Sequence, residues 1–182
     1  NIDLYVDANT KPIQFTIQDN AKGIPPEILG MAISPAGLQS KDSLNEHGMG
    51  MKQAIAALGK LRYLLTKTEN DANGRLIKEF RYGVLPVYEA EYIYPSGTEI
   101  SIGDLNPVVN ANSTNFTRSI VPYLGARYRR FLKPDHKQLE LTIRIRRFDQ
   151  PDQVNYEWHV KEDKPVYFHP STRTNEPVIT KY

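Results

Sequence analysis

Two short segments in the first third of the chain combine residue types that suit nucleotide recognition. Asp19 ends an apolar stretch that begins at Phe15, and Gly23 follows four residues later, ahead of Pro25 and Pro26. A carboxylate at a strand end accepts a hydrogen bond from the exocyclic amine of a purine, and a nearby glycine lets a flat base approach the backbone. Taken alone, the same residues also fit an ordinary turn between a strand and a helix.

The second segment is Gly48-Met49-Gly50-Met51-Lys52, which opens an amphipathic run that stops at Gly59. Glycines at the start of a helix leave backbone amides free beside the positive end of the helix dipole, and this arrangement suits phosphate oxygens. Lys52 adds a positive charge. Taken alone, the segment also fits a plain helix start with a solvated lysine.

The two commonest nucleotide-binding motifs are excluded. The only Gly-Lys pair, Gly59-Lys60, continues with Leu61 and lacks the upstream glycine of a Walker A loop. The segment from Gly48 to Gln53 lacks the third glycine of the dinucleotide fingerprint. A different type of nucleotide site is therefore indicated.

The two segments, in this order, resemble the GHKL ATP-binding family, whose members include gyrase B subunits, MutL, Bergerat-fold chaperones, histidine kinases and MORC proteins. Residues 15–28 resemble the first glycine box, and residues 96–100, Ser-Gly-Thr-Glu-Ile, are similar to the later Gly-Thr strand. Residues 37–41 and 47–54 resemble the lid and the second glycine box. Order and spacing agree over residues 1–105, and the lysine at position 52 is more similar to MORC and related bacterial proteins than to a histidine kinase.

The resemblance implies a role for each matched residue. Asp19 binds the adenine amino group, Gly23 lies beneath the base, and Thr98 supports the same water-linked contact. Backbone amides of residues 48–51 face the phosphates, and the neighbouring lysines add positive charge there. The implied nucleotide-binding residues are Asp19, Gly23, Ile24, Lys41, His47, Gly48, Met49, Gly50, Met51, Lys52 and Thr98. The implied ligands are ATP and Mg²⁺, and no catalytic or metal-binding residue is assigned within this chain.

The chain departs from the family pattern at two places. Ala21 stands where the first glycine box has its inner glycine. The family's N box, a helix with a water-activating glutamate and a magnesium-binding asparagine, is expected before Asn1, because residues 69–73 fit its spacing only within a turn-like stretch. We therefore expect an ATPase in a longer protein, and negligible hydrolysis by these 182 residues alone.

Positive charge is concentrated between Arg127 and Arg147, where eight basic residues stand against two acidic ones. Two interpretations remain open. In one, the charges form a solvated helix face and strand face; in the other, they bind nucleic acid or an acidic partner. The residues expected to contact nucleic acid are Arg127, Arg129, Arg130, Arg144 and Arg146. The four histidines have no metal-binding spacing.

The periodicity of apolar residues predicts an antiparallel hairpin of residues 2–6 and 13–17. Further strands are expected at 61–67, 76–82, 88–93, 98–102, 139–145 and 156–160. Helices are expected at 26–33, from 48–50 to 58, and at 118–132, the last with Ile120, Tyr123, Leu124 and Tyr128 on its apolar face. Residues 34–46 are expected to form a long loop.

Composition sets the remaining limits. There are no cysteines, 40% of the residues are hydrophobic, and the net charge is +2. The absence of cysteines excludes disulfide frameworks and thiolate metal sites. No apolar stretch approaches the roughly 18 residues of a membrane span. We expect a cytoplasmic protein that does not bind membranes.

The predicted fold class is α+β, a two-layer sandwich with a mixed, mostly antiparallel sheet and helices on one face, as in the Bergerat fold. Residues 1–105 are the expected ATP-binding core, and 106–182 an extension of the same domain. The leading hypothesis is the ATP-binding core of a GHKL-type ATPase that acts as a nucleotide-gated conformational or dimerisation switch, associating with itself or with another domain through its lid. The alternative is a non-hydrolysing nucleotide sensor or a nucleic-acid-binding module that uses residues 127–147.

Overall fold

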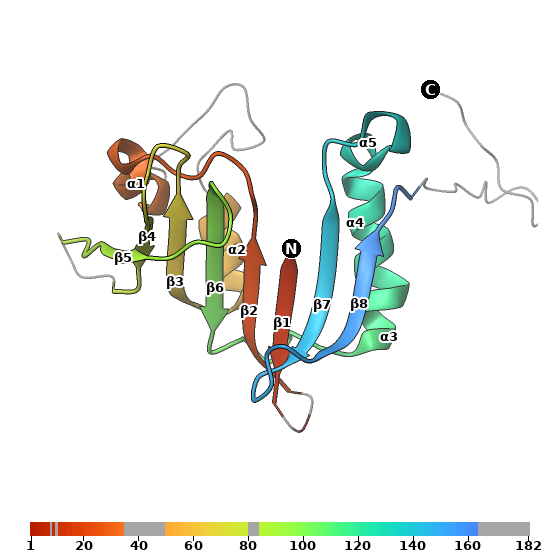
Figure 1. The fold of residues 1–182 in the computed structure, drawn as a ribbon. Coiled ribbons are helices and arrows are strands. Elements are labelled where there is room, and N and C mark those ends of the chain that lie inside the picture. The colour runs from red at the N-terminus through yellow and green to blue at the C-terminus, as the bar shows by residue number, and fades with distance from the viewer. Residues whose placement is uncertain (8, 10, 35–49, 80–83, 164–182) are drawn as a thin grey trace, which may run out of the picture. The chain divides into compact units, whose positions relative to one another are not determined.

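The computed structural model describes residues 1–163 apart from 8, 10, 35–49 and 80–83. Eight strands in this part of the chain form one sheet, ordered β5-β4-β3-β6-β2-β1-β7-β8 (Figure 1). Their bounds are β1 Ile2–Val6, β2 Pro12–Gln18, β3 Lys60–Lys67, β4 Gly74–Ile77, β5 Tyr88–Ala90, β6 Gly97–Gly103, β7 Leu141–Arg147 and β8 Val154–Val160. The β1–β7 pair is parallel, and every pair from β1 through β2, β6, β3 and β4 to β5 is antiparallel.

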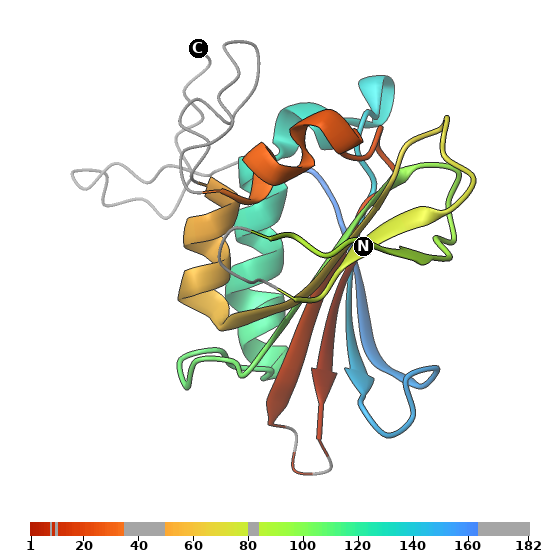
Figure 2. The same cartoon turned by 90° about the vertical axis from the view of Figure 1, so that its left-hand side faces the viewer.

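Two helices, α1 (Pro26–Ile33) and α2 (Gly50–Leu58), lie on the same face of the sheet (Figure 2). Helix α1 begins at Pro26 because proline suits the first helical turn, and Glu27 complements the helix dipole there. A mixed, mostly antiparallel sheet with helices on one face confirms the predicted α+β class. No helix that the structure describes is long and apolar enough to cross a bilayer.

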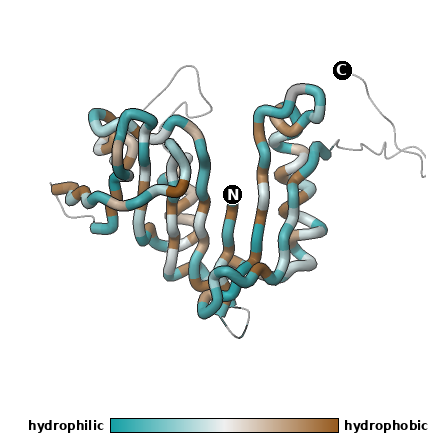
Figure 3. The backbone as a smooth tube through the Cα atoms, in the orientation of Figure 1, coloured by the Kyte–Doolittle hydropathy of each residue, from teal (hydrophilic) through white to brown (hydrophobic). Residues whose placement is uncertain are grey.

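The core forms where apolar residues alternate along the strands, a pattern visible in Figure 3. Leu4 of β1 lies opposite Phe15 of β2 and beside Ile145 of β7, which confirms the predicted hairpin. Leu29 of α1 packs against Leu64 and Ile77 of the sheet, and these three side chains are almost fully buried. Helix α1 therefore covers the β3–β4 part of the sheet.

Contacts within the chain divide it into two compact units, Asn1–Ala111 with Ile143–Glu157, and Asn112–Thr142 with Trp158 onward. The division between residues 105 and 106 remains a prediction. The second unit contains α3 (Ser113–Asn115), a π-helical turn (Phe116–Ile120), α4 (Val121–Arg127), α5 (Arg129–Leu132) and a short 3₁₀ turn (Pro134–His136). In this unit Phe116 stacks on Trp158 with ring centroids 5.5 Å apart.

The predicted helix at 118–132 is wrong in its start and in its apolar face. It starts earlier, because the Asn112 side chain accepts a hydrogen bond from the Thr114 amide and caps α3. A π-helical turn precedes Pro122, whose missing N–H and ring interrupt regular α-helical bonding. Of the predicted apolar face, Ile120 and Tyr123 are exposed, whereas Leu124 and Tyr128 are half-buried. The buried residues of these helices are Phe116, Gly125 and Leu132.

Three strands are shorter than predicted. β4 ends at Ile77 and β5 at Ala90, and residues 80–82 of the strand predicted at 76–82 lie outside the described residues. β7 begins at Leu141, because the amide of Leu139 donates to the carbonyl of Phe131 in α5 and so does not pair in the sheet. The expected loop at 34–46 falls, apart from Ser34, outside the described residues.

Candidate functional site

The carboxylate of Asp19 is held in one orientation at the end of β2. Its Oδ1 accepts hydrogen bonds from the amide of Ala21 at 2.9 Å and from the amide of Thr98 at 3.1 Å. The second bond joins residues 79 positions apart in the sequence, because β2 and the start of β6 are neighbours in the sheet. Among the described residues, none donates to Oδ2, and the Asp19 side chain is exposed.

The backbone of Asp19 is held against Gly97 and Tyr92. The Asp19 amide donates to the carbonyl of Thr98 at 2.8 Å, and the Tyr92 hydroxyl donates to the carbonyl of Asp19. Burial, followed by the nearby charge of Asp19, raises the pKa of Tyr92, so this hydroxyl remains a donor at neutral pH. Gly97 has φ +143°, and a Cβ at that position would lie 2.2 Å from the Asp19 carbonyl oxygen. Only glycine permits this approach.

The turn after Asp19 explains the departure at Ala21. Ala21 does not adopt positive φ; among the described residues outside glycine, only Asp104 does. Alanine is therefore compatible with this turn. Gly23, in contrast, has φ +71°, and a Cβ there would lie 2.0 Å from the carbonyl oxygen of Lys67. The second glycine of the box is required by close packing on β3.

A buried hydroxyl on β3 links the two segments that form the site. Oγ1 of Thr66 accepts from the Ile24 amide at 2.8 Å, donates to the Gly97 carbonyl at 3.1 Å, and lies 3.1 Å from Oγ1 of Thr98. Thr66 is fully buried. Since a hydroxyl has one proton and the Gly97 carbonyl can only accept, all three bonds form when Thr98 donates to Thr66. The Thr98 oxygen then offers only acceptor capacity to a ligand.

The amino end of α2 lies toward the same end of the sheet as Asp19. α2 ends at Leu58, and β3 starts two residues later at Lys60, opposite Gly103 at the far end of β6. Running back from there, α2 extends toward the end of the sheet where β6 starts (Figure 1). Gly50, Met51 and Lys52 form its first turn. Lys41, His47, Gly48 and Met49 lie outside the described residues.

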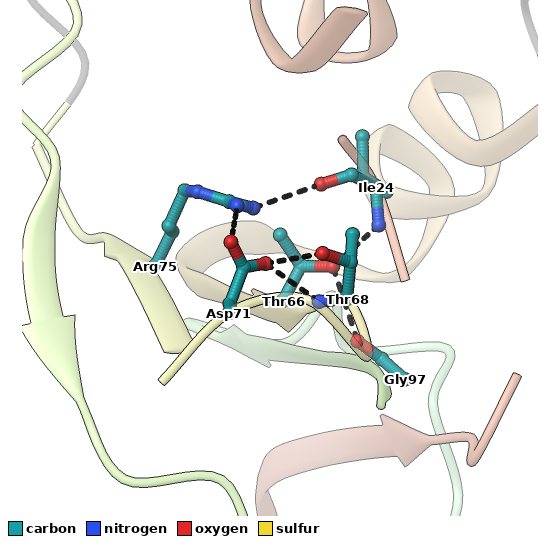
Figure 4. A network of polar contacts seen from close by, with 6 residues as sticks. All are labelled: Ile24, Thr66, Thr68, Asp71, Arg75 and Gly97. Atoms are coloured by element: carbon teal, nitrogen blue, oxygen red, sulfur yellow. Dashed lines mark hydrogen bonds and ion pairs between the residues drawn. The ribbon is translucent and has the colours of Figure 1, made fainter. Parts of the chain in front are cut away.

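Four residues of the site, Thr66, Asp71, Arg75 and Tyr92, were missed by the sequence prediction. Arg75 and Asp71 form an ion pair, and Arg75 Nη1 donates to the carbonyl of Ile24 at 3.2 Å (Figure 4). The spacing of four between Asp71 and Arg75 was the one available signal, since it suggests a pair. Their contact with Ile24 depends on the fold and has no local signal.

An open depression of about 440 Å³ lies beside this network. It is lined by Lys22, Pro25, Pro26 and Glu27 at the start of α1 and by residues 68–71 after β3. Neither Asp19 nor Thr98 lines it. The candidate site is therefore defined by the hydrogen-bonded groups around Asp19, with the depression as its neighbour.

No protein-family model and no curated protein matches the chain. Among solved structures, the chain is similar to the Aquifex aeolicus MutL ATPase domain complexed with ADP, with 14% identity and a TM-score of 0.48, over 90% of this chain and 56% of that one. It is also similar to the N-terminal domain of a DNA repair protein, with 13% identity and a TM-score of 0.49, over 87% and 45% of the two chains. The chain thus spans about half the length of these structures.

At these identities, the assignment of function depends on the side chains around Asp19 and not on the similarity itself. Among the described residues, no three histidine, aspartate or glutamate side chains come together as a metal site.

The basic segment separates into two groups. The arginines of β7 are paired: Arg144 with Glu157 at 2.6 Å, Arg146 with Asp3 at 2.6 Å, and Arg147 with Asp149 at 2.6 Å. Four cations of the second unit are exposed and form no ion pair with any described residue. They are Arg127, Arg129, Arg130 and Lys133.

Proposed function

We propose that this chain is the ATP-binding core of a GHKL-type ATPase. The observation that carries the proposal is the orientation of the Asp19 carboxylate. Two amides hold Oδ1, so Oδ2 presents an acceptor in a defined direction. A preoriented acceptor next to close-packed glycine backbone suits the exocyclic amine of adenine.

The hydroxyl of Thr98 supports the same base preference. Its proton is directed to Thr66, so its oxygen accepts from a ligand or from a bridging water. The Asp19 carboxylate and the Thr98 hydroxyl oxygen are two hydrogen-bond acceptors on one side of the pocket. They favour a base edge that presents hydrogen-bond donors to them. Guanine and hypoxanthine present a carbonyl in place of the adenine amine, so we propose that the site discriminates against both.

The phosphates are assigned to the amino end of α2. Its first residues leave backbone amides without helical partners, and the helix dipole favours negative charge there. Lys52 in the first turn adds a charge on the same side. Gly48, Met49 and Lys41 belong to this assignment through the motif resemblance alone.

We propose ATP hydrolysis as the activity that this site serves, and that the matched motifs do not carry it out by themselves. Transfer of a phosphoryl group to water requires a positioned base and, in this family, magnesium. The matched motifs supply neither. In the proposed cycle, ATP binding promotes association with a second subunit or another domain through the lid that the motif resemblance assigns, which makes the chain a nucleotide-gated switch.

The substitution Asp19→Asn tests the proposal. The asparagine oxygen can still accept from Ala21 and Thr98, so the fold is retained, while the amide NH₂ faces the base amine with donors. Loss of one charge-assisted bond predicts ATP binding weaker by at least about tenfold. Isothermal titration calorimetry with ATP and magnesium measures this.

Asp104→Asn is the matched control, because Asp104 is exposed at the other end of β6 and pairs only with Lys60 among the described residues. Asparagine also tolerates its φ of 44°. We expect this variant to bind ATP like the unaltered chain. Equal affinity of a folded Asp19→Asn variant for ATP contradicts the proposed pocket.

A second function, nucleic-acid binding, is favoured by the division within the basic segment. Arg127, Arg129 and Arg130 form no ion pair with any described residue and so offer positive charge to phosphates, whereas the β7 arginines are neutralised by carboxylates. Replacing Arg127, Arg129 and Arg130 by glutamine is expected to reduce the slope of log affinity against log salt by about 2.7, or about 0.9 per phosphate contact. Glutamine at Arg144, Arg146 and Arg147 is the control, and filter binding to duplex DNA is the assay. An equal slope in the two triple variants removes this function.

A further inference from the structure

The backbone of Ile24, the residue after Gly23, is held on both sides by side chains of β3 and β4. Its N–H donates to Thr66 Oγ1 at 2.8 Å, and its carbonyl accepts from Arg75 Nη1 at 3.2 Å (Figure 4). These contacts bridge 42 and 51 positions of sequence. A loop residue whose two polar groups are both bound by side chains has its peptide planes fixed in orientation.

The two side chains are themselves held in place. Thr66 is fully buried and bonded to Gly97. The guanidinium of Arg75 pairs with Asp71, and the Asp71 carboxylate accepts from the amide of Thr68 at 2.8 Å and from its hydroxyl at 2.5 Å. The Arg75 and Asp71 side chains are only 16% and 21% exposed. The Asp71–Arg75 ion pair is therefore more constrained than an ordinary ion pair on a protein surface.

A small displacement of Ile24 would be transmitted to Gly23. Gly23 packs so closely on β3 that a Cβ there would overlap the Lys67 carbonyl and would lie 3.2 Å from the Gly97 carbonyl oxygen. Gly97 in turn contacts the backbone of Asp19. The base-facing part of the candidate site is thus one packed unit, with Arg75 at its outer side.

We propose that Arg75, held by Asp71 and Thr68, is a positioning residue for the base side of the nucleotide site. This inference rests on the proposed function. Arg75 does not touch the nucleotide; it holds the Gly23–Ile24 backbone in the position that receives the base. A purely local role for the Asp71–Arg75 pair, as a brace of the β3–β4 turn, does not account for the bond to Ile24. Recognition of the base depends on Arg75, and recognition of the phosphates does not.

The test compares Arg75→Met with Arg147→Met in the full chain. Both variants remove an arginine paired with an aspartate in the first unit, but Arg147 contacts Asp149 and has no contact with the Asp19–Ile24 segment. Calorimetry with adenosine and with ATP is expected to show an equal loss for both ligands in Arg75→Met, of about tenfold. Arg147→Met is expected to bind both ligands like the unaltered chain.

A milder variant keeps the inference testable if methionine at position 75 unfolds the chain. Asp71→Asn retains an acceptor for Thr68 but removes the charge that orients Arg75. Its affinity loss is expected to be smaller than that of Arg75→Met, and the double variant is expected to lose no more than Arg75→Met alone, because Asp71 acts through Arg75. Additive losses of affinity in the double variant contradict this coupling. A general loss of stability would not produce the coupling.

The outcomes separate the two proposals. If the unaltered chain binds neither ATP nor adenosine, the proposed function fails and the positioning role fails with it. If the unaltered chain binds and Arg75→Met binds as tightly as Arg147→Met, only the positioning role is overturned. A loss for ATP without a loss for adenosine also overturns it, because that result places Arg75 on the phosphate side.

Discussion

Replacing Gly97 by alanine is expected to destabilise the chain strongly. The new Cβ would lie 2.2 Å from the Asp19 carbonyl oxygen and 2.8 Å from the Tyr92 hydroxyl, at φ +143°. A side chain at this φ costs about 1–3 kcal/mol. Overpacking against backbone that is held by its own hydrogen bonds adds about 1–3 kcal/mol. The sum, about 2–6 kcal/mol, is a large part of the roughly 5–15 kcal/mol that stabilises a typical domain.

Equilibrium denaturation in urea measures the change, with Gly30→Ala as the matched control. Gly30 lies within α1, and a Cβ there would have no heavy atom within 4 Å. Alanine is favoured over glycine in a helix interior, so this control is expected to gain about 0.5–1 kcal/mol. If Gly97→Ala changes the free energy of unfolding by less than about 1 kcal/mol, the close approach of Gly97 to Asp19 is not a feature of the protein.

Two further predictions concern the phosphate side and the pH dependence. Lys52→Ala is expected to weaken ATP binding more than adenosine binding, measured by calorimetry, because a phosphate contact is lost and the base contact remains; equal losses for the two ligands place Lys52 outside the phosphate site. Hydrogen bonds from the Thr68 hydroxyl and amide, together with the charge of Arg75, hold the pKa of Asp71 below its ordinary value of 3.8. The contribution of Asp71 to stability is therefore present above pH 3.8 and is lost as the pH falls through its lowered pKa, so denaturation of the unaltered chain and of Asp71→Asn should converge in acid. A difference in stability that stays constant as the pH falls argues against this carboxylate interaction.

Local pattern in the sequence was enough to predict where many elements of the fold lie, although not all of their bounds, and the class of the fold. The alternation in β1 and β2 predicted their hairpin, because side chains along a strand point alternately to the two faces of the sheet. Pro26 and Glu27 predicted the start of α1, since both suit a first helical turn. Asp19, Gly23 and Thr98 were also chosen from motif order, and the structure brings these three together.

Features that depend on distant segments were decided only by the tertiary structure. The bond between the Thr98 amide and Asp19 requires the register of β2 against β6. The contact of Arg75 with Ile24 requires the loop before α1 to approach β4, 51 positions away in the sequence. The pairing of Arg146 with Asp3 follows from parallel strands β1 and β7, which are far apart in sequence. Hydrogen bonds and ion pairs of this kind depend on register and on the approach of separate elements, which local periodicity does not encode. For this reason a predominantly basic segment is neutralised on its strand, whereas the cations on its helices pair with no residue that the structure describes.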